Sequence, residues 1–433
     1  MKKQYRLAFK TIHVLLVCVV LSIPGISSAQ EEEVTSSPEQ EKKLEWSGNF
    51  DAKYALFHMD ASSPFYTLQF LAERPSSSYL TQYRLEPYLN AEYRTSDLSF
   101  ILKTHATYYS DADARVDLFE AYGSFSPSFN TTLQAGKRVY NWGKGYAFNP
   151  VGFINSIKDP ENPELAQAGL LSANVEYIKS FQSQALQSLA LTAVFIPSTA
   201  LLNSRYGEAA SMDLALKTYL LIWDTDIDLM TYQSKDKPRR YGVDFAHNLR
   251  ENVEIHGEFS YAQNVQRYII RDGLLANEQT DAFSYLFGLR FLSASNTTLI
   301  AEYFHSGVGL GRGEYEQYYA FVLNGSTSSN PTVMQQTLGT MQTYFKGSNT
   351  MKDYLYVKLI HPEPFDWLYF TPSMYSIYNL TDKSFLLSMS FSYKPVMNVE
   401  FIVWPTILAG GTTTEYGGKQ MHERVELWMR VYF

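Results

Sequence analysis

Cysteine is almost absent from this chain of 433 residues, because Cys18 is the only one. It lies in an N-terminal segment that we expect to be removed, so the mature protein has no thiol for a disulfide or a metal site. The residue before it is Val17, whereas a lipoprotein cleavage site requires a small residue there. We therefore expect neither a disulfide framework nor a lipid anchor.

Apolar runs long enough to form a membrane-spanning helix are also absent. The longest run, Val14 to Ile23, is shorter than the roughly 20 residues that a helix needs to cross a bilayer. It follows several Lys and Arg residues and precedes Ser27-Ser28-Ala29, which completes the three-part pattern of a cleaved secretory signal. The sequence thus predicts a signal peptide over residues 1–29, cleaved between Ala29 and Gln30.

Basic residues are scarce relative to acidic ones, with 36 Lys and Arg against 44 Asp and Glu and a formal net charge of −8. This balance argues against a nucleic-acid partner. The motifs of common enzymes are missing as well, since the sequence contains neither an HExxH pattern nor a Gly-x-Ser-x-Gly elbow. We expect no catalytic residue, no cofactor and no metal site.

The main pattern in the chain is alternation of apolar and polar residues. This period of two places them on opposite faces of a β-strand. In the first such segment Leu44 and Trp46 share one face, and Glu45 lies on the other. The pattern predicts about 18 strands. They cover residues 44–58, 79–94, 98–109, 114–125, 131–140, 171–180, 186–196, 211–223, 225–233, 240–247, 252–263, 282–292, 297–306, 352–361, 366–379, 384–394, 398–408 and 422–433.

Aromatic residues reach 15% of the chain, with 33 Tyr and 27 Phe. Membrane β-barrels hide their apolar residues by alternation and concentrate aromatic residues at the two membrane interfaces. Short and long connections also alternate along most of the chain, as expected when both termini lie on one side of a membrane. The sequence predicts an all-β fold, a transmembrane antiparallel β-barrel over residues 44–433. It would lie in the bacterial outer membrane, in contact with outer-membrane lipid.

The alternative is a soluble β-sandwich. Its core would have to bury the charged face that carries Arg84, Glu86, Glu92 and Arg94. Each unpaired buried charge costs roughly several kcal/mol, whereas a water-filled lumen solvates all of them. Residues 30–43 are charged and lack apolar periodicity, so we predict a disordered periplasmic leader there. This leader is too short to form the plug of an energy-coupled receptor.

The last strand has one continuous apolar face and ends the chain on an aromatic residue. Such a strand is typical of the C-terminal signal by which bacterial outer-membrane barrels reach the barrel assembly machinery. An edge strand of a sandwich remains the other interpretation. The predicted assembly signal consists of Val425, Leu427, Met429, Val431 and Phe433.

The most distinctive motifs lie between residues 118 and 150. Glu120-Ala121-Tyr122 is followed by Lys137-Arg138, then by Asn141-Trp142-Gly143 and Asn149-Pro150. This region resembles the porin-like outer-membrane proteins of the group that includes alginate-export and related 18-stranded barrels. The resemblance implies an 18-stranded barrel. Lys137-Arg138 departs from the Arg-Gln pair that is usual in the group.

Charged residues on the polar faces of the strands are candidates for the pore wall. Glu120 and Arg138 fall on adjacent strands, where they can form a cross-strand pair. They either brace the wall or anchor the inserted loop 141–170 inside the channel; a plain surface loop is the alternative. The predicted wall residues are Arg84, Glu86, Lys103, Glu120, Arg138 and Arg290, and the predicted constriction-loop residues are Asp159, Glu161 and Glu164.

Two functions fit this pattern. The first is a porin-like channel for passive diffusion of a small solute or ion through a charged constriction. The second is a barrel that exports or binds a surface polysaccharide, whose sugar rings would stack on lumen aromatics. The aromatics expected there are Trp367, Tyr375, Trp404 and Trp428. We interpret the glycine-rich start of the long outer loop 307–351 as flexible.

Overall fold

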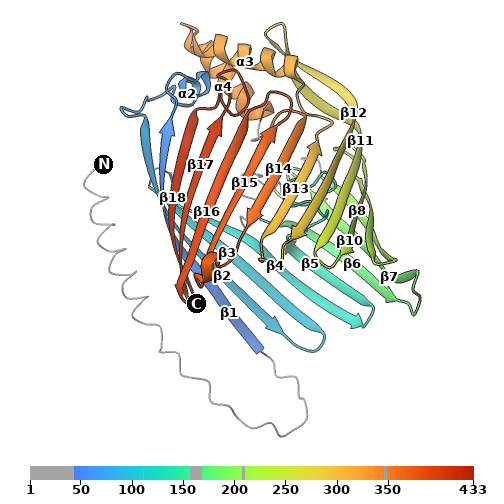
Figure 1. Ribbon diagram of the computed structural model, residues 1–433. Coiled ribbons are helices and arrows are strands. Elements are labelled where there is room, and N and C mark those ends of the chain that lie inside the picture. Colours follow the sequence, from blue (N-terminus) through green and yellow to red (C-terminus); the bar gives the residue numbers. More distant parts are fainter. Residues whose placement is uncertain (1–42, 111, 157–167, 207–209, 346, 348) are drawn as a thin grey trace. The chain divides into compact units, whose positions relative to one another are not determined.

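The computed structural model describes residues 43–110, 112–156, 168–206, 210–345, 347 and 349–433. They form one antiparallel sheet of 18 strands, in which each strand pairs with its neighbours in chain order and β1 also pairs with β18 (Figure 1). The prediction of a closed all-β barrel is confirmed. The strands are β1 (Lys43–Met59), β2 (Tyr79–Arg94), β3 (Leu98–Tyr109), β4 (Arg115–Ser128), β5 (Thr131–Arg138), β6 (Leu170–Ser180), β7 (Leu186–Ser198), β8 (Ser211–Ile222), β9 (Thr225–Gln233), β10 (Arg240–Arg250), β11 (Val253–Arg271), β12 (Leu274–Leu292), β13 (Thr298–His305), β14 (Asp353–Ile360), β15 (Phe370–Asn379), β16 (Phe385–Val396), β17 (Val399–Ala409) and β18 (Met421–Tyr432).

The two faces of the strands have the expected chemistry. On β18, Val425, Leu427 and Met429 are exposed on the outside of the barrel, whereas Glu426 and Trp428 are buried on the lumen side. The same division holds along β17, where Phe401 and Val403 point outward. An apolar outer face and a polar inner face are the reverse of a soluble protein, and they suit a barrel surrounded by lipid.

The barrel closes where β1 meets β18. Tyr54 pairs with Leu427 and Ala52 with Met429 in this register. On the lumen side, the Arg430 guanidinium donates two hydrogen bonds of 2.8 Å to the Asp51 carboxylate. Because the sheet of described strands is closed, none of its strands exposes unpaired backbone N–H and C=O groups to lipid, where each would cost several kcal/mol of free energy, roughly.

Three helices gather at one end of the barrel, opposite the C-terminus: α2 (Pro64–Gln69), α3 (Arg312–Ser326) and α4 (Pro331–Tyr344) (Figure 1). We name this the helix end and the opposite end the turn end. None of the helices in the described ranges is long and apolar enough to span a membrane. A single 3-10 turn, η1 (Pro364–Asp366), lies between β14 and β15.

The long loop 307–351, whose glycine-rich start we interpreted as flexible, contains α3 and α4 within its described residues. Tyr315, Tyr318 and Val322 follow a helical spacing and are all buried. Asn330 caps the N-terminus of α4, because its side chain accepts a hydrogen bond from the Thr332 amide. The first residue of the helix is Pro331. These local signals are short, and the Gly and Tyr residues around them weaken the helical pattern.

The loop expected at 264–281 is also absent. Strands β11 and β12 continue through it as a tall hairpin, and only Asp272 and Gly273 remain as a turn. Both have positive φ, at 51° and 78°. Such a two-residue Asp-Gly turn matches the twist of the strands, and it is a strong local hairpin signal that the alternation pattern alone does not use.

Candidate functional site

Residues 139–156, the described first part of the connection between β5 and β6, enter the barrel instead of lying over its end. We name these residues the inward loop. The Glu258 carboxylate on β11 accepts hydrogen bonds from the amides of Lys144 and Gly145, both 2.6 Å, and Val151, 3.3 Å. The side-chain amide of Asn149 donates to it as well, at 3.0 Å.

A second carboxylate, Glu302 on β13, holds the next part of the inward loop. It accepts hydrogen bonds from the amides of Tyr146, at 2.5 Å, and Ala147, at 2.9 Å. The His256 ring lies 3.1 Å from Glu302. Both Glu258 and Glu302 are fully buried. Two carboxylates on the far wall thus accept five backbone N–H groups that would otherwise be buried without acceptors.

Glycines allow this close approach. Gly143 has a φ of 98°, which residues with a side chain rarely adopt. A Cβ at this position would lie 2.6 Å from Glu258 Oε1. A Cβ on Gly145 would lie 2.0 Å from the carbonyl oxygen of Phe148. Substitution of either residue would push the backbone away from the carboxylate that holds it.

The apolar side of the inward loop packs on the inner wall of β7 to β9. Trp142, Val151, Phe153 and Ile154 form a buried cluster with wall residues from these strands. Asn155 closes the loop, because its side chain accepts from the Trp142 amide at 2.8 Å and donates to the Trp142 carbonyl at 2.7 Å. The inward loop therefore occupies one side of the lumen.

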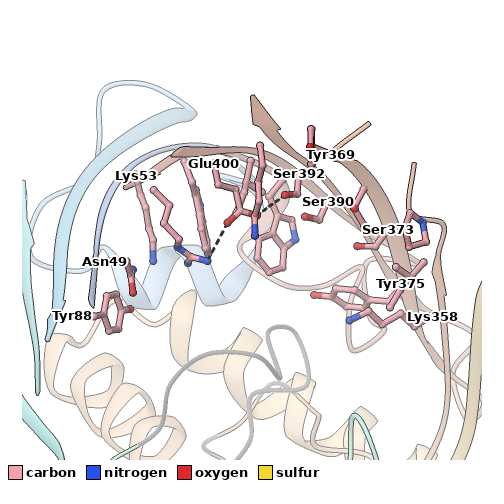
Figure 2. A pocket seen from close by; sticks show the side chains of 18 of the residues that line it. Asn49, Lys53, Tyr88, Lys358, Tyr369, Ser373, Tyr375, Ser390, Ser392 and Glu400 are labelled. Carbon is pink, nitrogen blue, oxygen red and sulfur yellow. Dashed lines mark hydrogen bonds and ion pairs between the residues drawn. The ribbon is translucent and has the colours of Figure 1, made fainter. Parts of the chain in front are cut away.

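A cavity of about 800 Å³ remains on the other side, lined by strands from β14 to β18 and from β1 to β4. We name it the inner cavity. Figure 2 shows Lys53, Tyr88 and Lys358 projecting into it. The cations lining it are Lys53, Lys103, Lys358, Lys394 and Arg430, and the lining aromatics include Tyr88, Tyr375, Trp404 and Trp428.

Carboxylates stand beside several of these cations. Lys53 Nζ lies 2.6 Å from Glu86 and 3.3 Å from Asp51. It also lies 4.0 Å from the centre of the Trp428 ring. A cation that contacts both a carboxylate and an aromatic ring has a fixed position. The charged groups of the cavity wall therefore have a defined arrangement.

The structure brings together four of the six predicted wall residues in two pairs. Lys103 Nζ lies 2.5 Å from Glu120, and Arg84 approaches Glu86 to 4.0 Å while pairing with Glu426 at 2.5 Å. Glu120 is buried, and it also accepts a hydrogen bond of 2.9 Å from the amide of Val139. It therefore contacts the start of the inward loop.

The expected pair between Glu120 and Arg138 is wrong. Arg138 donates instead to Gln134 on its own strand, and its guanidinium lies over the rings of Tyr122 and Tyr140. The register of β3 against β4 shifts between Lys103 and Thr104, where Phe119 is an extra residue in β4, and Lys103 then faces Glu120 directly.

The remaining predicted residues lie apart from this group. Arg290 is on β12, where its closest described carboxylate is Glu254 at 3.7 Å. Asp159, Glu161 and Glu164 lie outside the described residues. Of the predicted lumen aromatics, Trp404 and Trp428 are neighbours with ring centres 5.2 Å apart, whereas Trp367 stacks on Phe370 at the turn end and is 53% exposed. The expectation that Trp367 lies in the lumen is wrong.

Sequence reasoning missed the residues that hold the inward loop. Neither Glu258 nor Glu302 was among the predicted site residues. The available signal was a glutamate at an inward mid-strand position with no Lys or Arg beside it on the same face of its strand. Their partners are backbone amides far away in the sequence, and a motif search does not detect these.

The closed barrel with an inward loop has the fold of the 18-stranded outer-membrane porins. Pseudomonas aeruginosa OccK8 (OprE) is one similar structure, with a TM-score of 0.55 and 10% identity over 90% of this chain and 98% of that chain. Acinetobacter baumannii OccAB1 has a TM-score of 0.53 and 10% identity over 92% and 99%. Pseudomonas aeruginosa OccK2 (OpdF), in complex with glucuronate, has a TM-score of 0.53 and 10% identity over 90% and 98%. No family model and no curated protein matches the sequence.

Proposed function

We propose that this protein is a porin-like channel of the bacterial outer membrane, through which small solutes diffuse without a covalent step. The observation that carries the proposal is the inward loop, which Glu258 and Glu302 hold against the far wall beside an inner cavity of about 800 Å³. The inward loop narrows one side of the lumen and leaves the inner cavity on the other side, and such a constriction is typical of selective pores.

Small anionic solutes fit this cavity best. Five cations line the cavity, and carboxylates in the wall hold three of them, Lys53, Lys103 and Arg430, in a fixed position. Positive groups with aromatic rings between them suit a ring that bears a carboxylate. One similar porin structure contains glucuronate, a sugar of this kind.

The targeting assignments belong to the same proposal. Residues 1–29 act as a cleaved signal and residues 30–43 as a periplasmic leader; of these, only Lys43, the first residue of β1, lies within the described residues. The outward residues of β18 act as the signal to the barrel assembly machinery. The helix end would then face the outside of the cell, because the chain enters and leaves the barrel at the turn end.

The second candidate is a barrel that exports or binds a surface polysaccharide. The motif resemblance to alginate-export-type barrels favours it, as does the pair formed by Trp404 and Trp428 in the inner cavity. Stacking on sugar rings would then slow transport and give saturable binding.

Single-channel recording in a planar bilayer tests the proposal. The wild-type protein should form open channels, and Glu258→Leu should raise their conductance because three loop amides lose their acceptor. Each unsatisfied amide costs about 1–3 kcal/mol, enough to move the loop. The control is Glu254→Gln on the same strand, which should leave conductance unchanged. Wild-type protein that folds but never conducts would contradict the channel and favour the polysaccharide barrel.

A further inference from the structure

A second cavity of about 480 Å³ lies at the helix end of the barrel. We name it the outer chamber. Its walls come from α2, α3 and α4, from Phe345, Gly347 and Thr350 after α4, and from β1, β17 and β18 with the loop between the last two. Within the described residues, it shares no lining residue with the inner cavity.

The lining of the outer chamber is mostly apolar. The methionines, aromatics and leucine that line it are Phe57, Met59, Phe65, Tyr315, Tyr318, Met341, Phe345, Leu408 and Met421. The rings of Tyr318 and Phe345 are stacked with centres 4.3 Å apart. Methionine side chains adapt to irregular shapes and make favourable contacts with aromatic rings. Such a lining suits a flat apolar molecule.

The carboxylate at the chamber wall already has hydrogen-bond donors within the protein. Glu415 is 2% exposed and accepts hydrogen bonds of 2.7 Å from the Thr350 hydroxyl, the Tyr354 hydroxyl and the Asn379 side-chain amide. It also accepts a hydrogen bond from the Thr350 amide. Glu415 therefore ties the loop between β17 and β18 to the segment after α4, and Lys419 lies over the Tyr416 ring at 4.9 Å.

The chamber is not a packed core. Protein interiors are packed as densely as organic crystals and leave few voids larger than a water molecule. A volume of about 480 Å³ instead falls in the range of small-molecule sites, roughly 300–1,000 Å³. Apolar cavities of this kind hold water poorly and take up apolar molecules.

We propose that the outer chamber is a binding site for a neutral aromatic solute. The occupant is neutral because the two charged side chains of the described lining, Glu415 and Lys419, have opposite signs, and the buried carboxylate of Glu415 is saturated by four donors. It is aromatic because stacked rings and three methionines surround a space of that size. This site goes beyond diffusion through the inner cavity, since it binds a different chemical class and does not require conduction.

Isothermal titration calorimetry of the purified full chain in detergent micelles tests the site, with 1-naphthol as the probe and empty micelles as the blank. Wild-type protein should give saturable heat, and charged 1-naphthoate should bind more weakly. Met341→Asp places a carboxylate in the chamber and should weaken 1-naphthol binding by about tenfold or more. Val333→Asp is the matched control, because Val333 lies on the same helix and is exposed. It should leave binding unchanged.

Gln342→Trp provides an independent variant if Met341→Asp fails to show the heat-modifiable migration of a folded barrel. Gln342 lines the chamber from α4, and an indole there should fill it and reduce binding by a similar factor. Equal affinity in the wild type and in the folded chamber variants would overturn the proposal. Heat no greater than that of empty micelles would also overturn it.

Discussion

Arg267 shows how one side chain fixes the helix end. It projects from the tall β11–β12 hairpin, and its guanidinium donates to Glu314 at 2.8 Å and to the carbonyls of Gly309, at 2.9 Å, and Val308, at 3.2 Å. The Gly311 amide also donates to Glu314, at 2.7 Å. These contacts fix the first turn of α3 against the hairpin, so a single Arg–Glu pair sets where the helix begins.

The hydrogen bond from Arg267 holds the pKa of Glu314 below its ordinary value of 4.5. A lowered folded-state pKa means that the contact stabilises the fold above pH 4.5 and is lost as the pH falls through the lowered value. The hydrogen-exchange protection factors of α3, which are corrected for the intrinsic pH dependence of exchange, should therefore be constant from pH 7 to pH 5 and fall in more acid solution. Glu314→Gln should have lower protection factors already at pH 7, with a weaker acid response.

The control for this experiment is Glu316→Gln on the same helix, whose carboxylate is exposed and pairs with Arg312 one turn away. Exchange in this variant should follow the wild type, because exposed pairs contribute little. If Glu314→Gln and Glu316→Gln behaved alike, Arg267 would not hold the helix.

At the scale of the element, each strand is a boundary between lipid and lumen. On β16, Leu387 lies on the outer face, while Ser388 and Ser390 face the lumen. The inner positions differ from each other, however. Ser388 is fully buried and bonds to Thr406 at 2.9 Å and Trp404 at 2.6 Å, whereas Ser390 lines the inner cavity. A lumen-facing residue is therefore not always in contact with water.

Leu387→Arg should cost about 2–4 kcal/mol of unfolding free energy if the residue lies near the middle of the bilayer. Ser390→Arg should cost little, because the guanidinium enters an aqueous cavity. Ser388→Arg is not a suitable control, since it would break two buried hydrogen bonds. Urea unfolding in lipid vesicles measures all three. Equal losses for Leu387→Arg and Ser390→Arg would mean that the two faces are assigned incorrectly.

Closure of the barrel is a property of the whole molecule and depends on its two ends. The last residue, Phe433, exchanges two backbone hydrogen bonds of 3.1 Å with Gly48. A Cβ on Gly48 would lie 2.3 Å from the Tyr88 carbonyl oxygen and 2.6 Å from the Phe433 ring. Only glycine leaves room there for the terminal ring, so Phe433 contributes to the seam as well as to the proposed assembly signal.

Gly48→Ala should therefore reduce the amount of folded, heat-modifiable protein in the outer membrane. Replacing Val431 and Phe433 together with Asp should reduce it further, because the apolar end of β18 is lost. The matched control is Gly339→Ala in α4, where a Cβ meets nothing within 4 Å. Normal amounts of folded Gly48→Ala protein would show that the seam tolerates displacement of Phe433.

The sequence by itself determined the number and order of the strands, which face of each meets lipid, and the approximate strand ends except at the tall β11–β12 hairpin. Alternation is a local property, because neighbouring residues of a strand point to opposite sides whatever the strand pairs with. The alternation also predicted the barrel, because a strand face with charged residues such as Arg84 and Glu86 requires a water-filled interior. The alternation pattern did not predict the helices α3 and α4, because they contain few apolar residues and their helical periodicity extends over only a few turns.

Only the tertiary structure decided which inward residues meet. The partner of Glu120 depends on a bulge in β4, and the hydrogen bonds of Glu258 and Glu302 to the inward loop join residues more than 100 positions apart. Such contacts follow from the register of the strands around the closed sheet and from the path of a loop. Neither leaves a periodic trace in the sequence, because a backbone amide can satisfy a buried carboxylate whatever side chain it carries.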